Sequence, residues 1–430
     1  MNVRKLAVQS LLRCEEGAFS NLVQKKVLSE NELTELDRSF YTALFLGTLS
    51  RQITIDMFLE PFLKKGVSGL DPEVRGILRT GVYQLKWMDK IPAHAAIDES
   101  VKLCRSFRKA SASGLVNAVL RKAAAADPET VMHSGDLPKD LSTRYSVHRD
   151  TVVKLLDEYG DGAESILKAS LLPGSVFVRV NTLKTSEKAL VSETDLFEPT
   201  DIADCLKVKG SVRSISEFIE DGQVYVEGYP AQFAASVLGT GRGDRVLDLC
   251  SAPGGKTMCL AMAAGKEGSV TAIELYDHRA KLVSELADRL AVANVDVVCS
   301  DGRVYSSESR FDRVLCDVPC SGFGEMSSKP ELRSKPITRA SALPELQMEL
   351  LTHGASLLVS GGFLVYSTCT IFKEENEEII RPFLEANPDF EGYPISVKSE
   401  YALTVSEYER KFLPTDELPE GFYIALLRKL

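Results

Sequence analysis

The stretch RVLDLCSAPGGKTMCLAMAAG, residues 245–265, decides the fold of this chain. It begins as an apolar, strand-like run, turns at Pro253 and the adjacent glycines Gly254 and Gly255, and continues in a helical pattern. Adjacent glycines at such a turn let the backbone approach a ligand closely, and the amides of the following helix point toward that ligand. We therefore predict a ligand-binding loop between a strand and a helix.

Short apolar runs alternate with helical patterns from residue 241 to the end of the chain. The predicted strands are RVLDLC from Arg245, SVTAIE from Ser269, VDVVCS from Val295, DRVLCD from Asp312, GFLVYS from Gly362 and the final FYIALLRKL. This alternation indicates an α/β fold with a doubly wound sheet, which we assign to residues 236–430. Because no helix follows the last strand, we expect that strand to be antiparallel or to lie at an edge.

The sequence before this domain has two further parts. Residues 1–128 carry apolar side chains at helical spacing with few strand-like runs, so they predict an all-α domain. Residues 126–140 are polar and contain Pro and Gly, which marks a linker or boundary. In residues 138–235 a helical stretch, 149–171, precedes the strand-like runs SVFVRVNTL and VYVEG, and we expect a small α+β accessory module there.

Composition places the chain among ordinary cytoplasmic proteins. Its 430 residues are enough for two or three domains. No run approaches the roughly 18 consecutive apolar residues of a membrane helix, and the N-terminus becomes charged too early for a secretory signal. The nine cysteines include no C-x-x-C pair, so we expect reduced thiols and no metal site.

Charge is distributed unevenly along the chain. The net charge is −10, but residues 1–150 hold 22 Lys and Arg against 18 Asp and Glu, which leaves 29 against 43 for the rest. A local basic face is enough to bind a phosphate backbone, because counterion release depends on local contacts. The candidates are basic residues of one helical stretch and its successor; an ordinary solvated helix face is an equal alternative. They are Lys102, Arg105, Arg108, Lys109, Arg121 and Lys122.

The sequence of the glycine loop disfavours a nucleoside polyphosphate as its ligand. Gly255-Lys256-Thr257 matches the end of a phosphate-binding P-loop, but Cys250 stands where that motif requires its first glycine. The dinucleotide pattern G-x-G-x-x-G is absent as well. Glu274 ends the second strand, where a carboxylate can accept hydrogen bonds from ribose, and Asp301 follows the third strand. An adenosyl ligand without a polyphosphate indicates S-adenosylmethionine, unless both carboxylates only cap helices.

Two cysteines end the fourth and fifth strands of the predicted sheet. They lie in the dipeptides Pro319-Cys320 and Thr368-Cys369. The carboxyl ends of parallel strands meet in one crevice, so both thiols can face the same substrate atom, which indicates covalent chemistry. A lone cysteine at a strand end is more often inert packing, and we assign Cys250, Cys316 and Cys299 that way.

The chain at this point resembles a known family. The patterns C-x-A-P-G-G-K-T, D-x-P-C-S-G from Asp317 and S-T-C from Ser367 are those of RNA cytosine-5 methyltransferases of the Sun (Fmu) type. The stretches IPAHAAIDESVKL from Ile91 and ASGLVNAVLRK from Ala112 resemble the antitermination factor NusB. Together they resemble the bacterial 16S rRNA cytosine-5 methyltransferases over nearly the whole chain, least from about residue 139 to 240.

The resemblance implies a class I (Rossmann-like) methyltransferase domain, a NusB-like RNA-binding domain, S-adenosylmethionine as cofactor and 16S rRNA as partner of a monomeric protein. It implies that Cys369 attacks C6 of the cytosine, that Cys320 assists release, and that Asp317 contacts the N3/N4 edge of the base. Basic residues after the Pro-Cys motif become candidate RNA contacts, namely Lys329, Arg333, Lys335 and Arg339. The implied cofactor-binding residues are Cys250, Ser251, Ala252, Pro253, Gly254, Gly255, Lys256, Glu274, Asp301 and Asp317.

Three alternatives stay open at this stage. A Sun-type enzyme can act on tRNA or on another rRNA cytosine. A non-catalytic RNA-binding factor can keep the fold, although the intact cysteines and glycine loop oppose this. A P-loop NTPase is opposed by Cys250. The chain also departs from the family pattern, with Glu274 in place of Asp and GEMSSKP, residues 324–330, in place of a basic pair before Lys-Pro.

Overall fold

The computed structural model describes residues 2–337 and 341–430. It divides the chain into two compact units. The first, the helical unit, contains the residues up to Leu172 together with Glu325–Ile337, and the second, the sheet unit, contains the remaining described residues. The segment Glu325–Ile337 therefore leaves the sheet unit and packs in the helical one.

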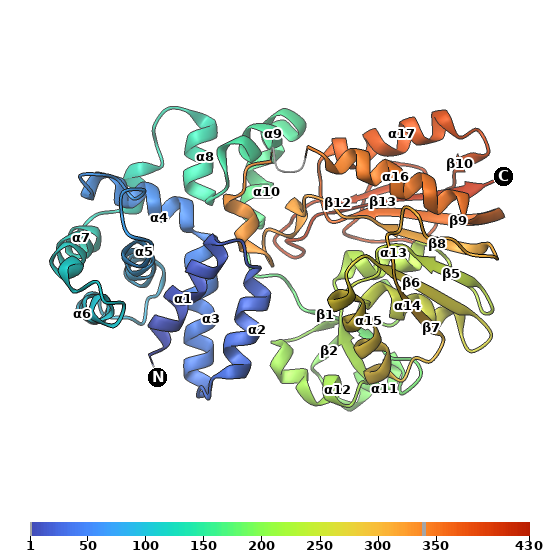
Figure 1. Ribbon diagram of the computed structural model, residues 1–430, viewed down its shortest axis with the longest axis horizontal. Coiled ribbons are helices and arrows are strands. Elements are labelled where there is room, and N and C mark those ends of the chain that lie inside the picture. The colour runs from blue at the N-terminus through green and yellow to red at the C-terminus, as the bar shows by residue number, and fades with distance from the viewer. Residues whose placement is uncertain (1, 338–340) are drawn as a thin grey trace. The chain divides into compact units, whose positions relative to one another are not determined.

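The helical unit confirms the predicted all-α start of the chain (Figure 1). In α5, for example, Val74, Ile77, Leu78 and Val82 follow helical spacing and are buried in its core. The helices are α1 Val3–Glu15, α2 Ser20–Glu30, α3 Glu35–Ser50, α4 Gln52–Leu59, α5 Pro72–Trp87, α6 Ala93–Ser106, α7 Ser113–Ala125, α8 Leu137–Tyr145, α9 Arg149–Tyr159 and α10 Ala163–Ala169, with the 3₁₀ turns η3 Pro128–Val131 and η7 Pro330–Ser334.

Helices α8 to α10 belong to this unit, although the sequence analysis placed residues 138–235 in a single accessory module. The physical reason is a set of hydrogen bonds between α8 and α4 that join residues far apart in sequence. Thr54 Oγ1 donates to the carbonyl of Thr143 over 2.5 Å, and the Ile53 amide donates to Ser146 Oγ over 3.0 Å. Such long-range contacts leave no mark in a local sequence pattern.

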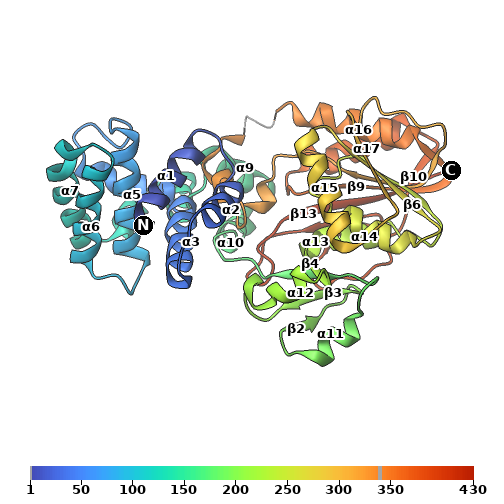
Figure 2. The same cartoon turned by 60° about the horizontal axis from the view of Figure 1, so that its bottom comes forward.

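The sheet unit begins with a small antiparallel sheet, as the runs SVFVRVNTL and VYVEG predicted (Figure 2). Its strands lie in the order β2-β3-β1-β4, and two short helices pack beside them. The elements are β1 Phe177–Val180, β2 Phe197–Pro199, β3 Cys205–Val208, β4 Val224–Val226, α11 Glu187–Glu193 and α12 Ser216–Glu220.

The larger sheet confirms the α/β fold and every strand that the sequence predicted. Its strands lie in the order β11-β12-β13-β9-β8-β5-β6-β7, with β10 paired to β13. The last strand is antiparallel to β9, as expected, but lies inside the sheet between β9 and β12. The strands are β5 Arg245–Asp248, β6 Ser269–Glu274, β7 Val295–Cys299, β8 Phe311–Asp317, β9 Leu358–Thr368, β10 Phe390–Gly392, β11 Leu403–Ser406, β12 Glu409–Phe412 and β13 Phe422–Lys429.

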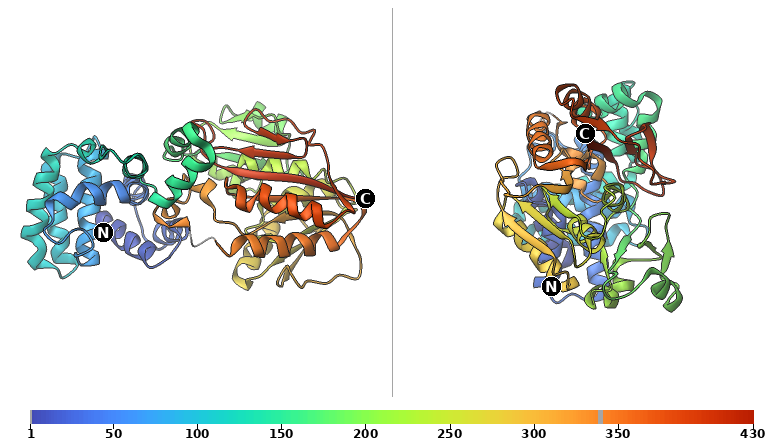
Figure 3. Two further views of the ribbon diagram at one scale, coloured as in Figure 1. Left: turned by 90° about the horizontal axis from the view of Figure 1, so that it is seen from above. Right: turned by 90° about the vertical axis from the view of Figure 1, so that its right-hand side faces the viewer.

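Helices cover both faces of this sheet, because successive strand residues point to opposite sides. Val365 packs in the core beneath one set of helices, and its neighbour Leu364 packs in the core beneath the other. The first set is α13 Tyr229–Val237, α14 Gly255–Ala264 and α15 Asp277–Leu290. The second is α16 Leu343–Ser356 and α17 Glu377–Ala386, the orange and orange-red helices along one face of the sheet (Figure 3).

The order of the strands determines where a ligand can bind. The chain proceeds from β5 outward to β6 and β7, then returns to place β8 on the other side of β5. All of these neighbours are parallel, so a crevice opens at the carboxyl ends of β5 and β8, where the order reverses. Within the described part of the chain, none of the helices combines the length and hydropathy that a bilayer-spanning segment needs.

Candidate active site

The two predicted thiols meet at the carboxyl ends of adjacent strands. Strands β8 and β9 are parallel, and their register pairs Asp317 with Ser367. The loops that follow bring Cys320 Sγ within 3.0 Å of Cys369 Sγ. Both residues are partly exposed, and neither forms a disulfide. One sulfur can therefore donate its proton to the other, and a substrate atom near one thiol lies near both.

A buried carboxylate, Glu375, holds the loop that carries Cys320. The Ser321 amide donates to Glu375 Oε2 over 2.8 Å. Gln347 Nε2 donates to the same oxygen over 3.0 Å and to the carbonyl of Pro319 over 2.9 Å. Gly322 has a φ of 75°, a conformation that favours glycine. Glu375 and Gln347 were not predicted as site residues, because a local sequence pattern does not show that a polar residue is buried.

Side-chain and backbone bonds likewise fix the loop around Cys369. Thr368 Oγ1 donates to Asn376 Oδ1 over 2.6 Å, and Asn376 Nδ2 donates to the carbonyl of Thr370 over 3.1 Å. The carbonyl of Cys369 accepts the amide of Gly324 over 3.0 Å. The carbonyl of Cys369 and both neighbouring residues are thus hydrogen-bonded, which fixes the backbone from which the sulfur projects.

An ion pair lies beside the thiols. Lys256 Nζ is 3.0 Å from Asp317 Oδ2, and Ser367 Oγ donates to Asp317 Oδ1 over 2.7 Å. Burial alone would lower the pKa of the Lys256 ammonium, but the carboxylates of Asp317 and Glu227 raise it above its ordinary value, and the sulfur of Cys369 contributes in the same direction. Lys256 therefore stays charged within electrostatic range of Cys369.

The glycine loop lies between β5 and α14, as the sequence predicted. Gly254 has a φ of 109°, and a Cβ added there would come within 3.2 Å of the Val283 backbone. Behind the loop, Thr257 Oγ1 donates to Asp248 Oδ2 over 2.7 Å. Burial raises the pKa of the Asp248 carboxyl to about 7, with a further contribution from Asp317. Asp248 Oδ1 is buried without a hydrogen-bond partner among the described residues, and the sequence analysis did not select this residue.

A carboxylate lies beside the first residue of α14, the helix that follows the glycine loop. A Cβ added at Gly255, the first residue of α14, would overlap the carboxylate of Glu227. A phosphate placed at this helix N-terminus would meet that negative charge. The geometry therefore opposes the NTPase alternative independently of Cys250.

The two predicted ribose and adenine contacts lie at the ends of neighbouring strands. Glu274 ends β6 and is buried; its Oε1 accepts the Tyr276 amide over 3.1 Å and lies 3.6 Å from an Arg279 nitrogen. Asp301 follows β7 and binds Arg303, whose Nη2 donates to Oδ2 over 2.7 Å. Hydrogen bonds from Arg303 hold the pKa of the Asp301 carboxyl below its ordinary value.

The remaining residues of the predicted cofactor loop line the same edge. The Ser251 amide donates to the carbonyl of Ile273 over 2.9 Å, and Arg279 donates to the carbonyl of Ala252, next to Pro253, over 3.0 Å. Loss of solvent raises the pKa of the Cys250 thiol well above its ordinary value. This loop is thereby tied to the end of β6 and the start of α15.

Among the cysteines assigned to packing, Cys316 is fully buried, as expected. The assignment of Cys299 to packing is wrong, because this residue ends β7 at the sheet edge and is exposed. Cys299 gives the chain an accessible thiol outside the Cys320–Cys369 pair.

The proposed RNA contacts of the helical unit differ in accessibility. Lys102 pairs with Asp98 and Glu99, and Lys109 pairs with Asp71. Those carboxylates offset part of the positive charge of the basic cluster. Arg105, Arg108 and Lys122 are exposed.

The prediction that Arg333 contacts RNA from the surface is wrong, because this side chain is only 1% exposed and is bonded inside the unit. Lys335 lies over the ring of Phe19 at 5.4 Å, and Lys329 pairs with Glu325. Arg339 lies outside the described residues.

Comparison with known proteins identifies the family. The model of the 16S rRNA methyltransferase RsmB/F family matches residues 235–428, and that of the NusB family matches residues 1–125. The chain is 34% identical to the probable ribosomal RNA small subunit methyltransferase B of Bacillus subtilis (strain 168), over 100% of this chain and 99% of the relative. The chain belongs to the ribosomal RNA small subunit methyltransferase B family.

Other members of that family and solved structures agree. The family member from Vibrio cholerae is 30% identical over 100% of this chain and 98% of its own length. The crystal structure of PH0851 covers 100% of this chain and 99% of its own with a TM-score of 0.85 and 25% identity. A methyltransferase homologue from Pyrococcus horikoshii is 29% identical, with a TM-score of 0.60 over 69% of this chain and 99% of its own. The recognition made from the sequence motifs is confirmed.

Proposed function

We propose that this chain methylates C5 of a cytosine in 16S rRNA, through a covalent bond between Cys369 and C6 of the base. The observation that carries the proposal is the 3.0 Å approach of Cys320 Sγ to Cys369 Sγ beside the Lys256–Asp317 ion pair. Ordinary methyl transfer to an oxygen or nitrogen needs no thiol. Two thiols at one position fit a reaction in which one sulfur adds to a carbon and must later leave.

The crevice suits S-adenosylmethionine, whose sulfonium and ammonium groups are positive. Carboxylates gather at the strand ends, and Asp248 Oδ1 lacks a donor there among the described residues. Glu274, at the end of β6, can accept from ribose hydroxyls. Glu227 at the start of α14 excludes a phosphate but attracts a cation. This charge pattern supports an adenosyl cation in preference to a nucleoside polyphosphate.

The first step is addition of Cys369 to the base. The Lys256 ammonium favours the thiolate form, whose electron pair forms a bond to C6 of cytosine. Asp317 faces the N3/N4 edge and supports a proton at N3, so the electrons displaced from the C5–C6 double bond are stabilised as an enamine. S-adenosylmethionine, which Glu274 and the glycine loop would hold, would supply the methyl group that C5 takes up and would leave as S-adenosylhomocysteine.

The second step is release of the product. A base removes the proton from C5, the double bond forms again, and the C6–S bond breaks with its electron pair returning to Cys369. Cys320 is close enough to its partner sulfur to serve this step directly or through water. Because its loop is fixed by Glu375, the position of this thiol does not depend on the substrate.

The proposal is tested by trapping the adduct. Purified wild-type protein and variants are incubated with 16S rRNA and S-adenosylmethionine and separated on a denaturing gel. Cys320→Ala should give a slowly migrating protein–RNA band, because addition proceeds and release does not. Cys369→Ser should give neither a band nor methylated RNA.

Cys299→Ala is the matched control, since Cys299 is an exposed thiol at another strand end of the same sheet. It should methylate like the wild type. Bisulfite sequencing of the product then reports whether the methyl group is on C5 and which cytosine carries it. Methyl transfer by Cys369→Ser, or a modified tRNA in place of 16S rRNA, would contradict the proposal.

A further inference from the structure

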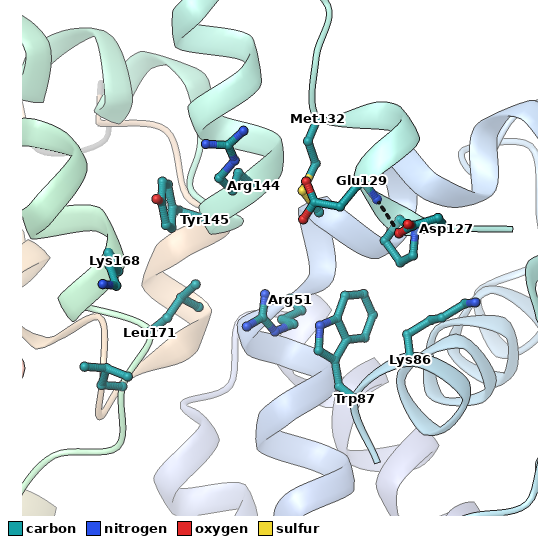
Figure 4. Close-up of a pocket in the computed structure, with 12 residues that line it drawn as sticks. Arg51, Lys86, Trp87, Asp127, Glu129, Met132, Arg144, Tyr145, Lys168 and Leu171 are labelled. Atoms are coloured by element: carbon teal, nitrogen blue, oxygen red, sulfur yellow. Dashed lines mark hydrogen bonds between the residues drawn. The ribbon is translucent and has the colours of Figure 1, made fainter. Parts of the chain in front are cut away.

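A cavity of about 450 Å³ lies inside the helical unit, apart from the residues of the catalytic crevice (Figure 4). It is bordered by the end of α5, the turn η3, the end of α8 and α10. Its walls combine an indole, a phenol, apolar side chains and several cations. The lining residues used below are Arg51, Lys86, Trp87, Arg144, Tyr145 and Lys168.

More cationic than anionic side chains line this cavity. Arg51, Lys86, Arg144 and Lys168 line it, against the carboxylates of only Asp127 and Glu129. Asp127 is engaged by the amide of Glu129 over 3.0 Å. The cavity therefore has a net positive wall in a chain whose total charge is −10.

Individual contacts show which cations are available to a ligand. Lys86 donates to the carbonyls of Ala124 and Ala126, at 3.1 and 2.5 Å. Arg144 reaches Glu164 only at 3.4 Å. Among the described residues, neither Arg51 nor Lys168 has a carboxylate partner. These two cations are left to balance their charge with solvent or a bound anion.

Trp87 holds Arg51 in place. The guanidinium carbon of Arg51 lies 5.2 Å from the centre of the indole ring, and Figure 4 shows the two side chains next to each other among the residues that line the cavity. Tyr83 stacks on Trp87 with 5.9 Å between ring centres and 23° between planes, which stiffens the platform. A guanidinium supported in this way keeps its donors available and offers a flat surface to a nucleobase.

A second buried guanidinium reinforces the positive charge. Arg333 donates to the carbonyls of Ser170 and Tyr145, each over 2.7 Å, and Tyr145 itself lines the cavity. No carboxylate among the described residues pairs with Arg333. Burial lowers the pKa of the Arg333 guanidinium to about 9, and repulsion from Arg51 adds to this. Two guanidiniums without a counterion are a costly arrangement that a bound anion relieves.

We propose that this cavity binds a nucleotide of single-stranded RNA, with its phosphate held by Arg51, Arg144 and Lys168 and its base against the Arg51–Trp87 platform. The proposal rests on the proposed function for the identity of the RNA, since an rRNA methyltransferase meets that polymer. A platform of aromatic and guanidinium groups beside free cations is how proteins bind unpaired nucleotides. The RNA is thus bound at a second point besides the target cytosine.

Trp87 makes the test direct, because it is the only tryptophan in the chain. Full-length protein carrying Cys369→Ser, which separates binding from methyl transfer, is titrated with a single-stranded 12-mer of 16S rRNA sequence. We expect a saturable change in tryptophan emission that weakens as salt rises. Affinity is measured in parallel by anisotropy of labelled RNA, since variants at Arg51 alter the emission itself.

Arg51→Gln should weaken RNA binding by about tenfold or more, as the loss of one charge-assisted hydrogen bond implies. The slope of log affinity against log salt should fall by about 0.7, the value for one phosphate of a single strand. Arg51→Lys should recover part of the affinity. Arg13→Gln is the matched control, because Arg13 is an exposed arginine on α1 outside the cavity.

Three outcomes would overturn the proposal. Tryptophan emission does not change at saturating RNA. Arg51→Gln and Arg13→Gln weaken binding equally. Inorganic phosphate alone reproduces the full emission change at concentrations at which RNA adds nothing, so that the cavity takes a small free anion. None of these outcomes bears on the covalent adduct, so failure here is distinct from failure of the proposed function.

Discussion

In the reaction that we propose, Lys256 accounts for how Cys369 becomes reactive. A thiol reacts as its thiolate, and a fixed positive charge nearby favours that form. Lys256 is held by Asp317 at 3.0 Å and is within electrostatic range of Cys369. The sequence motifs predicted this lysine as a cofactor-binding residue of the glycine loop, not as a neighbour of Cys369. Its pairing with Asp317 on β8 follows from the strand order, in which β5 lies beside β8.

Lys256→Gln should slow methyl transfer most strongly at neutral pH, with part of the rate recovered as the pH rises. Without the ammonium, a smaller fraction of Cys369 is thiolate at pH 7. A higher pH is then needed to deprotonate the thiol. The measurement is the alkylation rate of Cys369 by iodoacetamide between pH 6 and 10, read by mass spectrometry beside the rate at Cys299 as internal reference. Equal alkylation profiles in wild type and variant would contradict this role.

Asp248 gives a pH dependence of stability with a defined sign. Its folded pKa is raised to about 7, above the roughly 3.9 of an unfolded aspartate. A raised pKa means that the folded state binds the extra proton, so this contribution to stability is complete below pH 4 and is lost as pH rises through 7. We expect Asp248→Asn to remove that loss.

Urea unfolding of the ligand-free protein at pH 5 and pH 8 checks this prediction. The wild type should lose more of its free energy of unfolding between the two values than Asp248→Asn does. The substitution preserves a group that can accept from Thr257, which limits its other effects. Parallel pH dependences of the two proteins would show that Asp248 is already ionised in the folded state.

At the scale of elements, the regular strands were predictable and their long-range partners were not. Alternation of apolar runs and helical patterns located β5 to β9 and β13, because those signals are local. The short strands β10 to β12 were missed, since three or four residues carry little pattern. The motif residues of the site were found, but Glu375 and Asn376, which position the thiols, are ordinary polar residues until the fold buries them.

The segment Glu325–Ile337 is the least predictable element. Its Glu331 is 3% exposed and accepts hydrogen bonds from the amide and hydroxyl of Ser20, at 3.2 and 2.6 Å. Ser20 is the first residue of α2, where free amides attract a carboxylate, and no side chain of the preceding residue caps this helix. Glu331 thus caps a helix from which it is separated by most of the chain.

Glu331→Ala should lower the free energy of unfolding of the helical unit by about 2 kcal/mol, because it leaves buried donors at the start of α2 unsatisfied. Glu331→Gln, which keeps one acceptor, should cost less. Hydrogen exchange measured by mass spectrometry locates the effect, which we expect in α2 and in residues 325–337. The neighbouring pair Lys329–Glu325 is the control, since Glu325→Ala breaks a partly exposed ion pair of small value. Equal protection of α2 in all variants would exclude a capping role.

At the scale of the whole molecule, the catalytic part of the chain is not self-contained. Glu325–Ile337 belongs to the helical unit, and the bonds of Arg333 to Ser170 and Tyr145 join it to residues at the end of that unit. The chain therefore connects the loop of Cys320 directly to a segment that folds with the N-terminal residues. A fragment of residues 173–430 therefore lacks Tyr145 and Ser170, which bind Arg333, and Ser20, which binds Glu331.

Such a fragment should be poorly soluble, because its orphaned segment exposes apolar and charged groups that are buried in the full chain. Replacing residues 325–337 of the fragment by a Gly/Ser linker of equal length should restore a soluble monomer with intact near-UV circular dichroism. Co-expression with residues 1–172 should rescue the unmodified fragment and co-purify with it. If the unmodified fragment is as soluble and stable to urea as the linker variant, the segment folds independently of the helical unit. If co-expression rescues the unmodified fragment but not one carrying Arg333→Ala, the buried guanidinium is the contact on which that assembly depends.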